Sequence, residues 1–486
     1  MADRTLAQHL ATFAATSTYG SLPADVIDSV RGRVLDILGI CFAATELETS
    51  RAATTWVASQ GGVPHANAIG LHERVPAAQA AFVNGVLAHS LDYDDTHLPS
   101  VLHPSASVIP AALAAAQSVG ADGRATIAAI AIGIEVCVRI GMAGFDRATG
   151  NSTFFEHGQH ATSICGALGS AVAAGMLIGL SEQQLVDVLG VSASMASGII
   201  ESNRTGGTVK RMHCGWAAHS GVTAAQLVAL GITGPPTVLE GRFGFFQAWL
   251  HGTFNADEIT DGLGTEWSVP GIFFKPYPAN HFTHATIDAA LQLRADGVTP
   301  DDIESIEVGV AAPTVRAIGE PIDVKQAPDT GYMAQFSAPF TVAAALSGGG
   351  GLGLGLDDFS DERAHDPALR ALMSRITVVE DAECDAIFPH QFPAVLRVRT
   401  VDGRELVKKV LTNRGGPDRP LSFEELATKF RDNASRVLDA ATVQHIQETV
   451  AHLEDLTDLG PLLVGDSPAR NAQNVSHQVF EEPSHV

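Results

Sequence analysis

The feature that most constrains this chain is the helical spacing of small and apolar residues through roughly its first 260 positions. Apolar residues recur every three or four positions from Val26 to Cys41, which is the period of an amphipathic helix. Residues 125–142 and 161–177 repeat this spacing and are rich in alanine and glycine. Small side chains let helix axes approach closely, so this half is predicted to be a packed helical domain without a convincing strand.

The pattern changes after about residue 300, where short alternating segments appear. Ile306, Val308 and Val310 alternate with polar or small residues, as in a half-buried strand. The candidate strands cover residues 306–310, 376–379, 394–400 and 405–411. The last two flank Asp402-Gly403, a dipeptide typical of a β-hairpin turn. Helical patterns lie between the strands, so an α+β segment is predicted.

The helical pattern returns after Pro417, where Ser422 and Glu425 form a capping box. The order helical, mixed, helical predicts a mainly α protein, with a large all-helical domain formed by both ends of the chain and an inserted smaller α+β domain. The predicted parts are residues 1–268 and 413–466 for the helical domain and 269–412 for the insertion. The polar residues 467–486 are predicted to be a disordered tail.

The charge and cysteine content exclude several kinds of protein. The net charge is -24 and the pI ≈ 5.1, so nucleic acid would be repelled. The five cysteines lie far apart and match neither a metal motif nor a disulfide framework. The N-terminus lacks an apolar signal core, and the most apolar run, residues 125–134, is shorter than the ~20 residues that span a membrane. We expect a cytoplasmic protein that binds neither nucleic acid nor membranes.

The densest polar cluster runs from His89 to His97 and continues to His103. It contains Asp94 and Asp95, and follows one apolar helical pattern and precedes another. Such a cluster could bind a metal or position a proton-transfer histidine. No matching ligand cluster occurs elsewhere in the sequence, so a metal site is not expected. A solvated helix end is the alternative without chemistry.

Two further clusters carry imidazole and positive groups. His160 stands at the start of an alanine-rich helical pattern, where the helix dipole lowers the pKa of a histidine. A capping histidine without chemistry is the alternative. The segment with Arg204, Lys210, Arg211 and His213 concentrates cations in an acidic chain and is the most plausible carboxylate-binding segment. A solvated basic loop is its alternative.

A fourth cluster places Lys275 between aromatic residues and prolines, close to Tyr277. Partial burial would lower the pKa of this lysine and fit it for binding or proton transfer. A structural lysine at the domain junction is the alternative. The glycine run of residues 348–355 lacks the Lys-Ser/Thr of a phosphate-binding loop and is interpreted as a surface connection.

Five segments, in this order, resemble the MmgE/PrpD family: HSLDYDDTH with His103-Pro-Ser, GQHATSICGALGSAVAAG, TVKRMHCGWAAHSG, FKPYPANHFTHATIDAAL and GGPDRPLSFEELATKF. The resemblance implies a helical domain with a smaller α+β lid, a homodimer, and no metal or organic cofactor. It also places His103, His160, Lys210 and Lys275 at active-site positions of the family, with Asp94 in the acidic motif beside them.

The resemblance further implies a lyase that acts on small di- or tricarboxylates. Dehydration of a 2-methylcitrate-like acid is the first expectation, with cis-aconitate-like decarboxylation or iminodisuccinate-like epimerisation as alternatives. A third possibility is a non-catalytic polycarboxylate-binding or scaffold protein. The matching histidines and lysines argue against it. In this reading the catalytic residues are His103, His160, Lys210, Lys275 and Asp94, and the substrate-binding residues are Arg204, Arg211, His213, Tyr277 and Asp95.

One departure from the family concerns Phe340. The family's decarboxylase carries a tyrosine at this position, and phenylalanine can donate neither a hydrogen bond nor a proton. This weakens the expectation of decarboxylation unless Tyr332 or Tyr277 substitutes.

Overall fold

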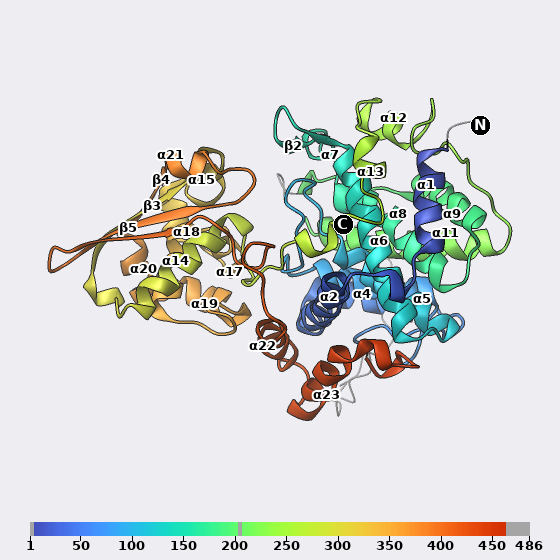
Figure 1. The fold of residues 1–486 in the computed structure, drawn as a ribbon. Helices are drawn as coiled ribbons and strands as arrows, with labels where there is room; N and C mark the ends of the chain where they lie inside the picture. The colour runs from blue at the N-terminus through green and yellow to red at the C-terminus, as the bar shows by residue number, and fades with distance from the viewer. Residues whose placement is uncertain (1–3, 203–206, 463–486) are drawn as a thin grey trace, which may run out of the picture.

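The computed structural model describes residues 4–202 and 207–462. These residues form a larger helical domain and a smaller domain built on a sheet, which lie side by side (Figure 1). The predicted mainly α fold is confirmed, since helices dominate the described residues. Arg204 and the predicted tail 467–486 lie outside the described residues.

The helical domain contains the long helices that the apolar spacing predicted. Its helices before residue 270 are α1 (Leu6–Thr16), α2 (Ala24–Ala44), α3 (Glu48–Ala58), α4 (Ala77–His89), α5 (Ser105–Val119), α6 (Gly123–Ala143), α7 (Thr153–Glu156), α8 (Ala161–Leu177), α9 (Glu182–Met195), α11 (Val209–Ala229), α12 (Phe245–Leu250) and α13 (Asp257–Thr260). α6 is long and apolar enough to cross a membrane, but 89% of its apolar window is buried within the protein. That degree of burial suits the core helix of a helical domain.

Close contact between α4 and α11 fixes two of the segments singled out above. A Cβ on Gly215 of α11 would lie 2.4 Å from the carbonyl oxygen of Phe82 on α4. A Cβ on Gly85 would lie 2.7 Å from the Cα of Gly215. Because the two backbones touch, the end of α4 at His89 and the start of α11 are held at a fixed distance.

The chain returns to the helical domain with α22 (Phe423–Ala434) and α23 (Ala440–Ala451). The predicted capping box is present, since Ser422 and Glu425 satisfy each other's backbone N–H groups. α22 packs on α2 and joins it through a buried ion pair, in which Lys429 Nζ is 2.7 Å from Asp36 Oδ1. The same ammonium lies 3.7 Å from the ring centre of Tyr93.

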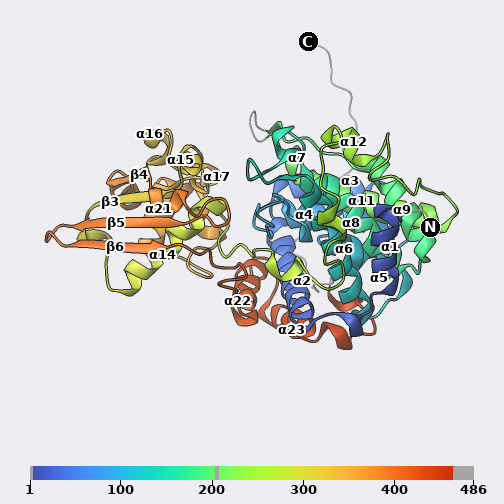
Figure 2. The same cartoon turned by 45° about the horizontal axis from the view of Figure 1, so that its top comes forward.

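The smaller domain is built on four strands, β3 (Ile303–Val310), β4 (Ile376–Glu380), β5 (Ala394–Thr400) and β6 (Glu405–Val410). Their order is β4-β3-β5-β6, with β3 and β4 parallel and the other pairs antiparallel. The predicted hairpin is confirmed as β5–β6, with Gly403 at φ 84° in its turn. The main helices of this domain are α14 (His284–Ala295), α18 (Ala338–Ser347) and α20 (Pro367–Met373), and Figure 2 shows strands β3, β5 and β6 lying side by side.

Each domain has its own apolar core. One core draws residues from both ends of the chain, including Leu6, Phe274, Leu421 and Leu462, whereas the second runs from Tyr277 to Val410. Core membership therefore changes just after residue 274 and again after residue 410. We propose domain boundaries close to the predicted positions 268 and 412 on this basis.

One small sheet precedes residue 300, where no strand was expected. β1 (Phe145–Asp146) pairs with β2 (Asn151–Ser152) as an antiparallel hairpin. Strands of two residues are too short to show an alternating pattern in the sequence.

Candidate active site

The centre of the site is the loop between α4 and α5, residues 90–104. Asp92 (φ 51°) and Val101 (φ 55°) both adopt the left-handed backbone conformation, which is uncommon for residues other than glycine and clusters at functional sites. Thr96 pairs its backbone with Phe273, which brings the segment carrying Lys275 against the loop. Two of the predicted clusters thereby meet at one place.

Asp92 lies between the two predicted lysines. Its Oδ1 is 3.5 Å from Nζ of Lys210 and 3.3 Å from Nζ of Lys275, and Lys275 also donates to its carbonyl oxygen at 2.6 Å. Burial alone would raise the pKa of Asp92, but Lys210 and Lys275 outweigh it and hold the pKa well below its usual value. Asp92 in turn raises the pKa of Lys210 against the effect of burial. The site therefore presents two cations to one carboxylate.

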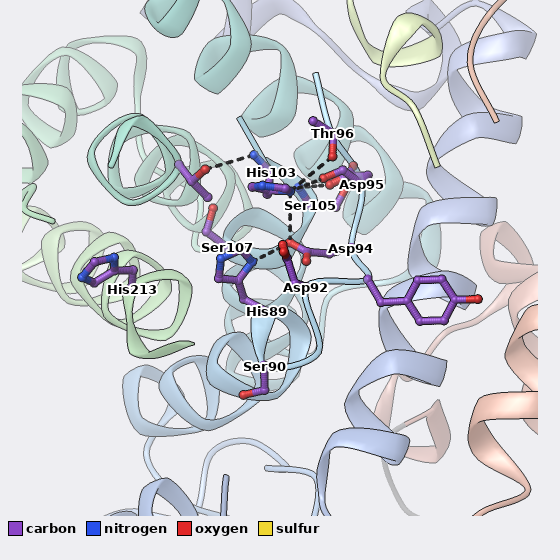
Figure 3. Close-up of polar contacts among 12 residues, drawn as sticks. His89, Ser90, Asp92, Asp94, Asp95, Thr96, His103, Ser105, Ser107 and His213 are labelled. Carbon is purple, nitrogen blue, oxygen red and sulfur yellow. Dashed lines mark hydrogen bonds and ion pairs between the residues drawn. The ribbon is translucent and has the colours of Figure 1, made fainter. Parts of the chain in front are cut away.

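His103 lies in the same loop beside a buried carboxylate (Figure 3). Its Nδ1 donates to the carbonyl oxygen of Asp95 at 2.6 Å and lies 3.8 Å from Oδ2 of Asp94. Nδ1 of His89 lies 2.9 Å from the same Asp94 oxygen. Burial lowers the pKa of His103 to about 4, although Asp94 opposes this effect. His103 is therefore neutral near pH 7, and its Nε2 is the nitrogen left for a ligand.

His160 forms a second layer behind this group. As predicted, it precedes α8 directly, as its N-cap residue. Its ring centre is 5.7 Å from that of His89, and its Nδ1 is 2.8 Å from Nδ1 of His213. Burial lowers the pKa of His160 well below its usual value, and His89 and Lys210 add to the shift. The row from His213 through His160 and His89 ends at His103, 5.1 Å beyond His89.

A cavity of about 650 Å³ opens at this cluster and is lined by both domains. Asp92, His103, Lys210 and Lys275 line it, so the structure brings three of the predicted catalytic residues to one crevice. Asp94 is fully buried behind His103, and His160 lies behind His89. These two act on a ligand only through their neighbours.

Four predicted substrate-binding residues lie elsewhere. Asp95 pairs with Arg33 at 2.6 Å in the interior, and Tyr277 is buried and donates to Asp288 at 2.6 Å. His213 contacts His160 rather than the cavity. None of these three side chains lines the cavity that holds His103, because each contacts another residue of the protein, so their role in substrate binding stays a prediction.

Arg211 is the fourth of these residues. It donates to Thr49 on α3 at 3.0 Å and lines an adjoining hollow that also contains Asp92, Lys210 and Tyr332. Arg211 is thus near the mouth of the site and outside the cavity that holds His103.

Among the residues that line or support the site without having been predicted are Asp92, His89 and His281. Asp92 and His89 lie in the acidic motif that the sequence analysis singled out, but other residues of that motif were named as site residues. His281 lines the cavity, and neither of its ring nitrogens has a hydrogen-bond partner among the described residues. Burial lowers its pKa well below the usual value. Its place directly after Pro-Ala-Asn gave no sequence pattern to favour it over His284.

One group of described residues has the spacing of a metal site: His89, Asp94 and His103, whose ligand atoms lie within 4.8 Å of one another. A carbonyl oxygen only accepts hydrogen bonds, so Nδ1 of His103, bonded to Asp95 O, carries a hydrogen, and only Nε2 of this ring has a lone pair for a proton or a metal.

In the structure, Phe340 no longer weakens the expectation of decarboxylation. Phe340 is fully buried in the core of the smaller domain, 5.6 Å from the ring of Phe359, and does not line the cavity. Tyr332, in contrast, is exposed and lines the cavity. A phenolic hydroxyl is therefore present at the site without one at position 340.

The chain matches two family models, the MmgE/PrpD N-terminal domain over residues 8–257 and the MmgE/PrpD C-terminal domain over residues 277–455. It is 30% identical to the cis-aconitate decarboxylase of Homo sapiens over 94% of both chains. It is 29% identical to that of Mus musculus, over 93% of this chain and 92% of the relative. The 2-methylcitrate dehydratase of Cupriavidus necator is 27% identical, over 84% of this chain and 86% of the relative. Both halves and their order match, so the chain belongs to the MmgE/PrpD family.

Proposed function

We propose that this chain is a lyase for a small polycarboxylate and that it decarboxylates a cis-aconitate-like acid. The observation that carries the proposal is the convergence of Lys210 and Lys275 on the single carboxylate of Asp92, beside His103. A substrate carboxylate offers these lysines the same oxygen acceptors. The similarity to cis-aconitate decarboxylases over most of the chain supports the same reaction.

The lysines bind the carboxylates that the product keeps. As the leaving carboxylate departs as carbon dioxide, its bonding electrons form a new double bond to the central carbon. The existing double bond opens, and its far carbon gains negative charge that is shared with the adjoining carboxylate. Lys210 and Lys275 stabilise this charge because they are already held in place before the reaction.

His103 supplies the proton that this carbon takes up. It is neutral in the free protein, and the negative charges of a bound substrate raise the pKa of a nearby imidazole. Asp94, 3.8 Å away, stabilises the imidazolium. His160 then acts indirectly, as a proton carrier through His89.

Dehydration of a 2-methylcitrate-like acid is the second candidate, and the low pKa of His103 favours it. A histidine that is neutral near pH 7 is ready to remove a proton from the carbon beside a carboxylate. The same lysines would stabilise the resulting charge while a second group protonates the departing hydroxyl. The 2-methylcitrate dehydratase relative supports this candidate.

Incubation of the purified chain with cis-aconitate, 2-methylcitrate and citrate separates these functions. Release of carbon dioxide from cis-aconitate supports decarboxylation, and a rise in enoate absorbance from 2-methylcitrate supports dehydration. Exchange of a substrate proton with solvent deuterium, without either change, supports epimerisation. Ligands that raise the melting temperature without turnover support a binding protein, and no response at all refutes the polycarboxylate site. A His103→Asn variant controls for reaction outside the site.

Two expectations remain proposals for this chain, a homodimer, which the resemblance implies, and a cytoplasmic location, which the sequence pattern predicted. Sedimentation analysis at several concentrations tests the first, and fractionation of cells that express the chain tests the second.

A further inference from the structure

We infer that the acid taken by this site carries an apolar substituent, such as an alkyl chain, next to its carboxylates. The inference rests on the proposed function and adds the class of substrate. Its basis is the division of the cavity into a charged part and an aromatic part. Among the described residues that line it, only Asp92, Lys210 and Lys275 are aspartate, glutamate, lysine or arginine, and these three meet at one point.

The smaller domain contributes the first aromatic wall. Phe282, Phe388 and Phe392 line the cavity and contact one another, with ring centres 4.7 Å apart for Phe282 and Phe392 and 5.8 Å apart for Phe388 and Phe392. His281 joins this wall to the charged part, since its ring centre is 5.3 Å from that of Phe392. The apolar surface is therefore continuous with the group that holds the carboxylates.

The helical domain contributes the opposite wall through the β1–β2 hairpin and α7. Phe145 and Phe155 line the cavity from this side, and Phe155 is 44% exposed. Figure 1 shows β2 and α7 at the edge of the helical domain that faces the sheet domain. The walls meet, because a Cβ on Gly150 would lie 3.2 Å from Pro389. The aromatic part thus lies between the two domains.

A substrate made only of carboxylates would leave these rings without an apolar partner. The cavity, at about 650 Å³, falls within the range of about 300–1,000 Å³ that holds drug-sized ligands. Polar residues of the aromatic part, such as Thr149 and His390, are exposed at its rim. An alkyl group placed between the walls would bury apolar surface while its carboxylates stay on the lysines.

A series of 2-alkylsuccinates tests this directly, because these acids carry two carboxylates and one alkyl chain and need no turnover. Dissociation constants of succinate, ethylsuccinate and butylsuccinate are measured by calorimetry on the full chain. We expect affinity to rise about threefold to fourfold for each methylene, which is the usual gain on burial of about 0.8 kcal/mol per methylene. Equal affinity of succinate and butylsuccinate overturns the inference, whether or not the chain turns over cis-aconitate.

Variants locate the alkyl chain. Phe155→Ser and Phe388→Ser should each lower the ratio of butylsuccinate to succinate affinity by about fivefold or more, as expected when one wall of a buried alkyl group is lost. Phe243→Ser, at a phenylalanine that is 89% exposed and outside the cavity, is the matched control and should keep the ratio of the unaltered chain. Melting curves check that each variant is folded.

The outcomes keep this inference separate from the proposed function. If the alkyl gain is present and lost in both variants while no acid is turned over, the substrate class stands and the lyase proposal fails. If cis-aconitate is turned over but the gain is absent, the lyase proposal stands and the inference is wrong. A gain that persists in both variants places the chain elsewhere on the protein and also overturns the inference.

Discussion

Replacement of Asp94 by asparagine removes a buried negative charge from beside His103 and nearly preserves the side chain's shape. Asp94 Oδ2 is 3.8 Å from Nδ1 of His103, and an amide oxygen can still accept from His89. Two unit charges about 4 Å apart interact by about 4 kcal/mol at an effective dielectric constant of about 20. Since about 1.4 kcal/mol changes a rate tenfold, a step that needs the His103 imidazolium, as proton donor or as product, should slow by up to about 10³-fold.

The assay is kcat and kcat/KM of D94N across acid and neutral pH. Burial lowers the pKa of His103 to about 4 and Asp94 opposes this, so D94N should lower the pKa further and move the limb of the pH profile that reports His103 to lower pH. Asp323→Asn, at an exposed aspartate of the smaller domain, is the matched control. A folded D94N enzyme with a rate within about threefold of the unaltered chain, and an unmoved His103 limb in the pH profile, would refute the role given to Asp94.

Three more outcomes are expected. Lys210→Met should raise KM by about ten- to hundredfold, because one charge-assisted hydrogen bond is lost, whereas Lys409→Met, at an exposed lysine, should leave KM unchanged. Equal KM values for Lys210→Met and the unaltered chain would show that Lys210 does not bind the substrate. In the proposed decarboxylation, which needs protonated His103, kcat/KM should fall as the pH rises above about 4, whereas in dehydration, which needs neutral His103, it should fall below about pH 4; a limb near neutral pH would contradict both. Lys429→Met should cost about 3–5 kcal/mol in denaturant unfolding, and added Asp36→Leu should recover most of it; additive losses would contradict a buried pair.

The helical spacing was enough to predict the fold class because each helix depends mainly on its own residues. The capping box at Ser422 and the Asp402-Gly403 turn were likewise predicted from a few neighbouring side chains. The short β1–β2 hairpin was missed, since its pairing involves only two residues in each strand. Local sequence patterns therefore predicted the longer helices and strands but missed the short β1–β2 hairpin.

The sequence also indicated the segments that meet at the site, but it could not choose among the acids of one motif. Asp92, Asp94 and Asp95 are equally polar and almost adjacent. In the structure Asp92 contacts Lys210 and Lys275, and Asp94 lies behind His103. Asp95 pairs with Arg33, which is 62 residues away. That assignment depends on partners brought close only by the packed fold.

Local sequence by itself determined which stretches form the long helices and which segments carry the imidazoles and cations. Tertiary structure alone decided which of those side chains face the cavity. Tyr277 shows the reason, since its hydroxyl is drawn inward by Asp288 and by Arg414, which is 137 residues away. A backbone period is set by near neighbours, whereas the direction of a polar side chain is set by whichever distant partner satisfies it.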